Sequence, residues 1–381
     1  MDKIDEVLTR SVKEVLPDKD ALAKLMQKKK IKIYLGIDPS NPQIHLGNAV
    51  ALRKLRQFQD LGHKVILLIG DFTGMIGDPT DKSAARKKLT KEEVEQNANT
   101  YKEQAAKILR FEDPNPAEVK FNSKWLGKLS SADWIELISN LTSQQLEERD
   151  MFVARKKEGK PIFMHEMIYP IMQGYDSVIM AVDLEIGGTD QTFNMLVGRH
   201  LMKTLKNKEK FVLTVPLLIG TDGQKMGKST GNFIPIDDKA ADMFGKVMSI
   251  RDDLIAQYFE LTTDVDPKSV DLSKPMAAKK RLAYEIVKIY HGKKAAKTAQ
   301  EEFESVHQKG SVPENLNIYV KEDISLIDAV STLVSSKSQA KRLIDQGAVE
   351  IDGQVIKDAK IKTKKGQVLK VGKRTYAKVG E

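Results

Sequence analysis

The chain has 381 residues, of which 41% are hydrophobic and 30% are charged, as expected for a soluble globular protein with two or three domains. It contains no cysteine, which excludes disulfides, thiolate metal sites and cysteine nucleophiles. Lys and Arg outnumber Asp and Glu by 62 to 53, and no segment approaches the roughly 18–20 consecutive apolar residues of a membrane-spanning helix. Residues 4–16 alternate apolar and acidic side chains at helical spacing without a signal-peptide core, so we expect a cytoplasmic protein.

Strand and helix signals alternate in the first part of the chain. We expect strands at 31–37, 65–69 and 182–186, and helices at 48–61, from about Thr90 onward, and at 190–203 after a Gly-Gly turn. Thr90 and Glu93 form a capping box, and residues 65–69 are apolar on both faces, as in a buried parallel strand. This alternation predicts an α/β fold, a Rossmann-like doubly wound parallel sheet that binds ligands at the carboxyl ends of its strands.

The rest of the chain changes character twice. Residues 238–307 have helical periodicity, and residues 308–318 are typical of a linker. Two helical stretches follow at 325–333 and 337–346, and then short strands flank an Asp352-Gly353 turn. We therefore expect an α/β domain at 1–222, a helical domain at 223–318 and a small α+β domain at 319–381.

Positive charge is concentrated near the C-terminus. Residues 357–378 contain nine Lys or Arg and one Asp, a local net charge of +8. A solvated lysine face explains such a run about as well as a binding site for a polyanion such as RNA.

Three segments have features of a ligand site. In the first, residues 38–48 place His45, Gly47 and Asn48 between a strand and a helix, where backbone N–H groups suit a phosphate. This pattern alone is more often a chance loop. In the second, residues 223–231, Lys225 and Lys228 lie in a glycine-rich loop, as in a mobile phosphate clamp.

Two other motifs match residues 223–231 only in part. A Walker A loop needs four residues between its glycines, and three separate Gly223 from Gly227. A nucleophile elbow around Ser229 needs a buried strand immediately before it, and residues 221–225 are a polar turn. A P-loop ATPase and a serine hydrolase are therefore disfavoured.

The third segment, residues 164–180, predicts an apolar helix with one polar stripe. Tyr169, Gln173 and Asp176 lie at i, i+4 and i+7, and Pro170 predicts a local helix start or kink. Buried polar groups need partners, so a ligand pocket is favoured over a solvated face. The histidines lack metal-ligand spacing, and we expect no metal site within the protein.

Together these segments resemble class I aminoacyl-tRNA synthetases, and among them the bacterial tyrosyl family. His45-Leu46-Gly47-Asn48 resembles the HIGH motif, and Lys225-Met226-Gly227-Lys228-Ser229 resembles KMSKS. The tail resembles a small RNA-binding domain named for a ribosomal small-subunit protein. The resemblance covers essentially the whole chain and implies an enzyme that activates tyrosine with ATP and transfers it to tRNA(Tyr), with Mg²⁺ assisting and as a homodimer.

The resemblance also implies the roles of individual residues. The tyrosine site would comprise Tyr34, Asp78, Tyr169, Gln173, Asp176 and Gln191, with Thr73 nearby. The ATP site would comprise Asp38, Ser40, His45, Gly47, Asn48, Asp190 and Lys228. The catalytic side chains would be His45, Asn48, Lys82, Arg86, Lys225, Lys228 and Ser229, and the RNA-binding ones Lys341, Arg342, Lys362, Lys364, Lys365, Lys373 and Arg374.

Three residues depart from the family pattern. Asn48 replaces the second histidine of HIGH, Gly227 replaces the first serine of KMSKS, and Asp81 replaces a glycine next to Lys82. An amide at Asn48 can still bond a ribose or phosphate oxygen, so we expect activity.

Two alternatives remain. The related tryptophanyl enzymes share the fold and both motifs, but an indole has no hydroxyl for Tyr34 and Asp176, which favours tyrosine. A non-enzymatic RNA-binding protein would explain the tail but would leave the polar constellation around Tyr169 without a purpose.

Overall fold

A computed structural model describes residues 2–78, 89–227, 231–308, 319–334, 336–372 and 375–380. The chain forms two compact units, Met1–Ala296 and Lys297–Glu381. The predicted domain boundaries at 222 and 318 stay predictions, and most of the expected linker lies outside the described residues. Within the described part of the chain, no helix has the length and apolar character needed to cross a bilayer.

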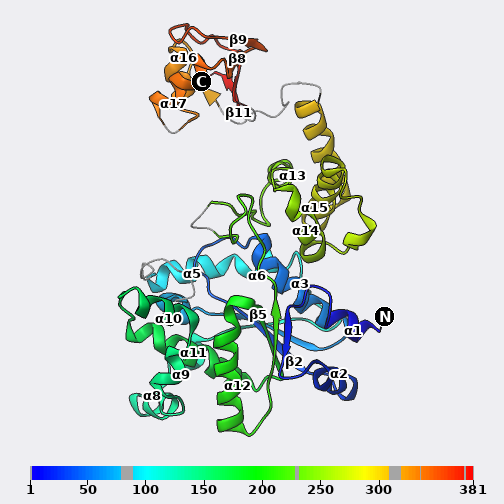
Figure 1. The fold of residues 1–381 in the computed structure, drawn as a ribbon, viewed down its shortest axis with the longest axis vertical. Coiled ribbons are helices and arrows are strands. Elements are labelled where there is room, and N and C mark those ends of the chain that lie inside the picture. The colour runs from blue at the N-terminus through cyan, green and yellow to red at the C-terminus, as the bar shows by residue number, and fades with distance from the viewer. Residues whose placement is uncertain are drawn as a thin grey trace. The chain divides into compact units, whose positions relative to one another are not determined.

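The first unit is built around a six-stranded sheet in the order β1-β6-β5-β2-β3-β4 (Figure 1). Its strands are β1 (Glu14–Leu16), β2 (Lys32–Ile37), β3 (Lys64–Ile69), β4 (Glu118–Phe121), β5 (Leu184–Gly188) and β6 (Phe211–Val215). β1 pairs antiparallel with β6, and the other pairs are parallel. The predicted α/β fold is confirmed, although the sequence patterns did not reveal β1, β4 and β6.

Gly187 and Gly188 correct one expectation. They belong to β5 and pair with Thr214 and Val215 of β6, so they do not form a turn. A Cβ on Gly187 would lie 2.9 Å from the sulfur of Met195, and one on Gly188 would lie 2.5 Å from Oδ1 of Asp190. These glycines therefore permit a close approach of side chains to the strand.

Helices connect and cover the strands. Those of the first part are α1 (Lys3–Val7), α2 (Lys19–Lys28), α3 (Leu46–Asp60), α4 (Thr73–Ile76), α5 (Lys91–Asn99), α6 (Tyr101–Ala105), α7 (Ser123–Leu126), α8 (Ser131–Ile138), α9 (Ser143–Glu147), α10 (Asp150–Lys157), α11 (Met164–Met180) and α12 (Thr192–Lys206). The capping box of Thr90 and Glu93 starts α5 as expected. Helix α11 begins at Met164 and continues through Pro170, so this proline does not start it.

The sheet core is apolar on both faces at its centre. Every residue from Val65 to Ile69 of β3 is at most 2% exposed. Burying one such side chain contributes about 1.5–3 kcal/mol. Helices α11 and α12 approach each other closely, because a Cβ on Gly174 would lie only 3.2 Å from Cα of Gly198. The core thus holds α11, with its polar stripe, against the sheet.

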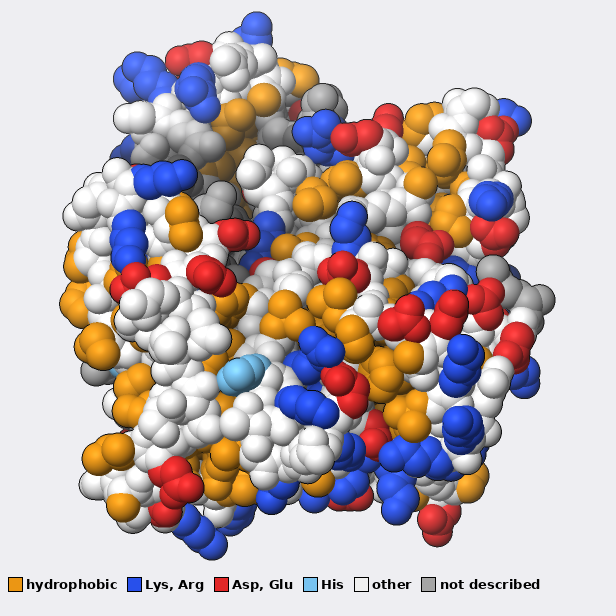
Figure 2. All heavy atoms as spheres, turned by 60° about the horizontal axis from the view of Figure 1, so that its bottom comes forward, with side chains coloured by type: hydrophobic (Ala, Val, Ile, Leu, Met, Phe, Trp, Pro, Cys, Tyr) orange, Lys and Arg blue, Asp and Glu red, His pale blue; other side chains and the backbone are white. Residues whose placement is uncertain are grey.

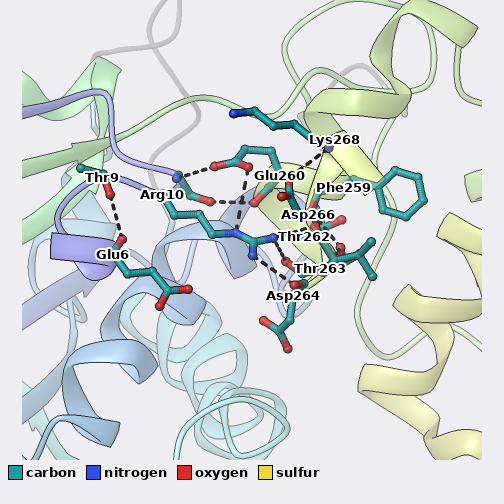
Figure 3. Close-up of polar contacts among 12 residues, drawn as sticks. Glu6, Thr9, Arg10, Phe259, Glu260, Thr262, Thr263, Asp264, Asp266 and Lys268 are labelled. Atoms are coloured by element: carbon teal, nitrogen blue, oxygen red, sulfur yellow. Dashed lines mark hydrogen bonds and ion pairs between the residues drawn. The ribbon is translucent and has the colours of Figure 1, made fainter. Parts of the chain in front are cut away.

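The N-terminal segment ties α3 to a following helical region, which contains α13 (Ala240–Met248), α14 (Ile255–Thr262) and α15 (Pro275–Gln308). The Arg10 guanidinium donates hydrogen bonds to the main-chain oxygens of Thr263, Asp264 and Val265, at 2.8–3.1 Å (Figure 3). Lys54 of α3 is buried, and its Nζ donates to the main-chain oxygens of Val7 and Arg10 at 2.8 and 2.6 Å. Burial lowers the pKa of Lys54 to about 7.

The second unit contains a five-stranded sheet in the order β7-β11-β10-β8-β9. Its elements are β7 (Tyr319–Val320), α16 (Leu326–Ser331), α17 (Lys337–Asp345), β8 (Val349–Ile351), β9 (Gln354–Val355), β10 (Val368–Val371) and β11 (Thr375–Val379). Asp352 and Gly353 join β8 to β9 with φ of 50° and 82°, the positive pair of a type I′ hairpin turn. The predicted hairpin and both predicted helices are therefore confirmed.

Candidate active site

The predicted site residues gather where three neighbouring strands end. Asp38 follows β2, Gly70 and Thr73 follow β3, and Asp190 follows β5. β2 lies between β3 and β5. The chain runs from β2 to β3 and β4 on one side of β2, and then crosses to β5 and β6 on the other side. Such a switch in strand order is where doubly wound sheets bind ligands, as predicted.

Asp38 is oriented by two hydroxyl groups. Thr73 donates to Oδ1 of Asp38 at 2.7 Å, and Tyr169 donates to Oδ2 at 2.8 Å. Burial, and then the carboxylates of Asp38 and Asp78, raise the pKa of Tyr169 well above its ordinary value, so its phenol stays a donor. Gly70 leaves room for this cluster, because a Cβ there would lie 2.0 Å from Oδ1 of Asp38.

Tyr34 lies in the middle of β2 and is fully buried. Its hydroxyl lies 2.9 Å from Oγ of Ser177 on α11. Burial, reinforced by the carboxylates of Glu185 and Asp176, raises the pKa of Tyr34 well above its ordinary value. The Tyr34 phenol is therefore neutral and can exchange hydrogen bonds with a second hydroxyl group.

Asp176 is buried one helical turn from Gln173. Its Oδ1 accepts a hydrogen bond from Nε1 of Trp125 at 2.7 Å, and its Oδ2 accepts one from Nδ2 of Asn122 at 3.2 Å. Burial raises the pKa of Asp176 well above its ordinary value, while these two donors oppose the shift. The structure thus provides a desolvated carboxyl group whose direction is set by two fixed N–H donors.

The remaining tyrosine-site candidates are linked by amide side chains. Nδ2 of Asn194 donates to the side-chain oxygens of both Gln173 and Gln191, at 3.0 Å each. Gln191 in turn donates to Asp78, which also forms a 3.0 Å ion pair with the buried Arg149. These contacts bring Gln173, Gln191 and Asp78 into one network, and their role in binding tyrosine stays a prediction.

The first motif forms the start of α3. The main-chain N–H of Asn48 donates to Nδ1 of His45 at 3.3 Å, and the amide oxygen of Asn48 accepts from the main chain of His45 at 3.2 Å. This reciprocal cap gives Asn48 a structural role at the position of the expected second histidine. A Cβ on Gly47 would lie 3.0 Å from the His45 ring, so a glycine fits best here.

The second motif lies against the first. A Cβ on Gly47 would come within 3.6 Å of the sulfur of Met226, which is itself buried. Main-chain hydrogen bonds of 2.9 and 3.0 Å also join residues 44–46 to residues 234–236. The tertiary structure therefore brings together two motifs that are nearly 180 residues apart in the sequence.

Lys225 forms an ion pair with Asp190, with 2.8 Å between Nζ and Oδ2. The main-chain N–H of Gly227 donates to the side chain of Asn232 at 2.9 Å, which anchors one side of this loop. Ser40 is exposed beside Asp38. The candidates Lys82, Arg86, Lys228 and Ser229, and the departure Asp81, lie outside the described residues.

The predicted RNA-binding residues lie in the second unit. Lys341 and Arg342 are exposed on α17, and Lys364 and Lys365 are exposed in the loop before β10. Lys362 forms an exposed 2.9 Å ion pair with Asp323. Lys373 and Arg374 lie outside the described part of the chain.

Sequence reasoning did not identify Asn122, Trp125, Ser177, Glu185 or Lys210 as site residues. Ser177 continues the polar stripe of α11, eight residues after Tyr169, and this signal was available. Glu185 is a charged residue within an apolar strand, which is a second signal that was not used. Lys210 ends the charged run Lys208-Glu209-Lys210, so the sequence did not distinguish it from its neighbours. Asn122 and Trp125 follow β4, a strand that the sequence patterns did not reveal.

The fold and the site define a class I aminoacyl-tRNA synthetase. Residues 26–308 match the family described as "tRNA synthetases class I (W and Y)", and residues 327–369 match the S4 domain. The chain belongs to this family of class I tRNA synthetases.

The names of its relatives are more specific than that of the family, because they include the amino acid. The chain is 46% identical over 393 residues to a tyrosine–tRNA ligase of Moorella thermoacetica, covering 98% of this chain and 94% of that protein. It is 48% identical over 366 residues to a tyrosine–tRNA ligase of Desulfotalea psychrophila, covering 92% and 90%.

Solved structures have the same fold. A C-terminally truncated mitochondrial tyrosyl-tRNA synthetase of Aspergillus nidulans matches with a TM-score of 0.66 at 21% identity, covering 80% of this chain and 93% of that one. The tyrosyl-tRNA synthetase of Archaeoglobus fulgidus, solved with L-tyrosine, has a TM-score of 0.61 at 22% identity, covering 78% and 98%.

The packing around Asp38 predicts a large effect of one methyl group. We expect Gly70→Ala to lower the free energy of unfolding by about 1–3 kcal/mol, because its Cβ would force Asp38 and Thr73 apart. The matched control is Gly245→Ala in α13, because among the described residues a Cβ at Gly245 would have no neighbouring atom within 4 Å. Alanine there should raise the free energy of unfolding by about 0.5–1 kcal/mol, since glycine is unfavourable within a helix. Urea unfolding measures both, and equal effects would contradict the packing described here.

Proposed function

We propose that this chain is a tyrosine–tRNA ligase that converts tyrosine and ATP to tyrosyl-adenylate and pyrophosphate, and then transfers the tyrosyl group to the 3′ end of tRNA(Tyr). The observation that supports this best is a pair of buried polar groups in a class I synthetase fold, the Tyr34 hydroxyl on β2 and the Asp176 carboxyl group on α11. The names of the close relatives agree with it. The cytoplasm is the proposed site of action.

The same pair supports tyrosine over tryptophan. A phenol hydroxyl can both donate and accept a hydrogen bond, and it would satisfy the Tyr34 hydroxyl and the Asp176 carboxylate together. An indole or an unsubstituted phenyl ring would leave buried polar groups without that partner, which costs about 1–3 kcal/mol for each neutral group and more for a charged one. A protein that only bound RNA would have no need of this arrangement.

Activation needs no nucleophile from the protein. An α-carboxyl group has an ordinary pKa of about 3.5, so the substrate carboxylate is already ionised at neutral pH and can attack the α-phosphate of ATP. Tyr169, Gln173 and Asp78 would hold the α-ammonium group of tyrosine, and Asp38 and Gln191 would complete the surroundings of the adenylate. Positioning and charge stabilisation would then supply most of the acceleration.

The phosphates would lie between the two motifs. His45 and the start of α3 offer N–H donors, and Lys225 offers a positive charge beside Asp190, which we assign to the ribose. Lys225 and Asp190 are 44% and 21% exposed, and exposed ion pairs contribute only about 0–1 kcal/mol. A nucleotide could therefore replace this pair at little cost. Ser40, Asn48 and Lys228 keep their proposed roles in binding ATP. Asn48, Lys82, Arg86, Lys228 and Ser229 keep their proposed catalytic roles.

We place Mg²⁺ on the nucleotide. Among the described residues, no group of three or more His, Cys, Asp or Glu side chains could hold a metal ion. Mg²⁺ commonly binds through substrate phosphates and one or two carboxylates, and here it would neutralise part of the phosphate charge.

The second unit would bind tRNA through its basic side chains. On the face shown in Figure 2, acidic and basic side chains lie side by side with hydrophobic ones between them. The charge balance of residues 357–378 is not mixed in this way, because they carry nine basic residues and one acidic residue. Phosphate contacts from Lys341, Arg342, Lys364 and Lys365 would release counterions from the RNA. The match of this region to the S4 domain supports that assignment.

We further propose a homodimer. Large apolar side chains are exposed in neighbouring segments of the first unit, among them Ile135 (65%) on α8, Val153 (38%) on α10, and Phe163 (44%) and Met164 (70%) at the start of α11. A contiguous exposed apolar patch is typical of an interface with another subunit, and we propose that these side chains form such a patch.

Substrate choice provides the first functional test. Wild-type enzyme should catalyse tyrosine-dependent ATP–pyrophosphate exchange. Asp176→Asn should lower kcat/KM for tyrosine by about tenfold to a hundredfold and narrow the preference for tyrosine over phenylalanine, because a neutral amide accepts the phenol proton less strongly. The matched control is Glu166→Gln, a buried carboxylate on the same helix that binds Arg155 instead. An unchanged preference in Asp176→Asn would place the hydroxyl site elsewhere.

The tail provides the second test. Lys364→Ala combined with Lys365→Ala should weaken tRNA charging several-fold at limiting tRNA and reduce the slope of log affinity against log salt by about 1–2. Pyrophosphate exchange should be unaffected, since it requires no tRNA, and it serves as the internal control. Charging that matches wild type at every salt concentration would show that these lysines form a solvated surface and do not contact tRNA.

The dimer provides the third test. Met164→Glu should convert the protein from dimer to monomer in sedimentation velocity experiments, because a carboxylate would be buried at the interface. Met276→Glu is the matched control, since Met276 is similarly exposed at 58% but lies on α15. A wild-type monomer, or equal effects of the two substitutions, would refute the proposed surface.

A further inference from the structure

A buried ion pair lies outside the predicted set of substrate-contacting residues. Glu185 of β5 is 2% exposed, and Lys210, immediately before β6, is 0% exposed. Nζ of Lys210 contacts Oε2 of Glu185 and donates to the main-chain oxygen of Met195 at 3.1 Å. Burying two charges costs several kcal/mol per ion unless their remaining hydrogen-bonding capacity is used. The other contacts of Glu185 therefore decide what this pair does.

Glu185 reaches both ends of the proposed tyrosine site. Its Oε1 accepts a hydrogen bond from Nε2 of Gln173 at 3.0 Å, and its Oε2 accepts one from Oγ of Ser177 at 3.4 Å. Ser177 is also the partner of the Tyr34 hydroxyl, at 2.9 Å. Gln173 is assigned to the ammonium end of the substrate and Tyr34 to its phenol end. One carboxylate is thus connected to both.

The charge on Glu185 also sets the direction of the amide network. Because the Gln173 nitrogen faces a carboxylate, the Gln173 oxygen must serve as the acceptor for Asn194. Asn194 donates to Gln191 as well, which leaves the Gln191 nitrogen to donate to Asp78. The network therefore begins at one carboxylate and ends at another, and each amide between them has a single orientation that satisfies its neighbours.

Helix α12 leaves space for this pair at one residue. A Cβ on Gly198 would lie 2.5 Å from Nζ of Lys210 and 3.1 Å from Oγ of Ser177. Nζ of Lys210 also lies 6.0 Å from the centre of the Tyr34 ring. Lys210, Ser177 and Tyr34 therefore meet at one packed junction, where a shift of any one moves the others.

We propose that Glu185 and Lys210 are positioning residues for the amino-acid substrate: with Ser177 they fix the side chains of Gln173 and Tyr34, and so determine tyrosine affinity and selectivity without touching tyrosine. This inference rests on the proposed function. A pair that contributed only to stability could be replaced by apolar groups with little effect on substrate binding.

Three substitutions, of which Ser177→Thr restores the hydroxyl that Ser177→Ala removes, and one control test the proposal in the full-length enzyme. Ser177→Ala removes one hydroxyl and should leave the fold intact. Glu185→Gln removes the negative charge that Gln173, Ser177 and Lys210 contact. The control, Lys54→Met, removes another buried lysine. Lys54 donates hydrogen bonds to the main-chain oxygens of Val7 and Arg10, which are not part of the Glu185 network. Tyrosine Kd by calorimetry, KM for tyrosine and for ATP in pyrophosphate exchange, the ratio of tyrosine to phenylalanine use, and the Tm are measured for each.

We expect Ser177→Ala to raise the Kd and KM for tyrosine several-fold and to lower the tyrosine preference. Glu185→Gln should raise both constants by about tenfold or more, while KM for ATP stays within twofold of wild type. Lys54→Met should lower the Tm and leave the tyrosine constants unchanged. Ser177→Thr, which restores the hydroxyl, should recover tyrosine affinity relative to Ser177→Ala.

The proposal is overturned if Ser177→Ala and every foldable Glu185 variant bind and discriminate tyrosine as wild type does, even when their Tm falls. It is also overturned if KM for ATP rises as much as KM for tyrosine. Failure of the wild-type enzyme to exchange pyrophosphate with tyrosine would instead refute the proposed function, so the two failures are distinguishable.

Discussion

Polar groups that are buried within the sheet and against α11 must find partners within the protein, and the geometry of the site depends on this constraint. Three carboxyl groups, of Asp38, Asp176 and Glu185, lie in or beside the same apolar region. Asp38 accepts hydrogen bonds from two hydroxyl groups, and Asp176 accepts them from two N–H donors. Glu185 accepts them from a lysine, an amide and a hydroxyl group. Each carboxyl group therefore has a distinct environment and can have a distinct role.

These environments influence one another. The charges of Glu185 and Asp38 add to the burial that raises the pKa of Asp176, while Trp125 and Asn122 oppose it. The positive charge of Lys210 offsets part of the repulsion between Glu185 and Asp176, because Lys210 forms an ion pair with Glu185. Burial nevertheless lowers the pKa of Lys210 itself. In a region of low dielectric constant such couplings are stronger than in water, so the site behaves as one electrostatic unit.

Close packing supports this unit at a few glycines. Gly70 makes room for Asp38, Gly188 for Asp190, and Gly198 for Lys210 and Ser177. In each case a methyl group would occupy the space of a polar atom that the site uses. The glycine of the first motif belongs to the same pattern, since Gly47 allows the His45 ring and Met226 to approach the start of α3.

The sequence by itself determined the fold class, the main helices, the two motifs and the polar stripe of α11. Period-3.6 and all-apolar patterns are local, and a buried helix or strand displays them in its own residues. The family resemblance also supplied the proposed tyrosine-site residues, because the motifs establish their order along the chain, and their roles stay predictions. The type I′ turn at Asp352 and Gly353 was predictable for the same local reason, since those two residues tolerate positive φ.

Only the tertiary structure decided how these residues are connected. The short strands β1 and β4 have too few residues for a pattern, and their place depends on pairing with β6 and β3. The partners of Tyr34 and Asp176 come from other elements, and no local signal in the sequence states which distant hydroxyl or N–H group will face them. Glu185 and Lys210 are 25 residues apart and become one ion pair because β5 and β6 are adjacent and parallel. Side-chain partnership is a property of the packed sheet, whereas periodicity is a property of each segment alone.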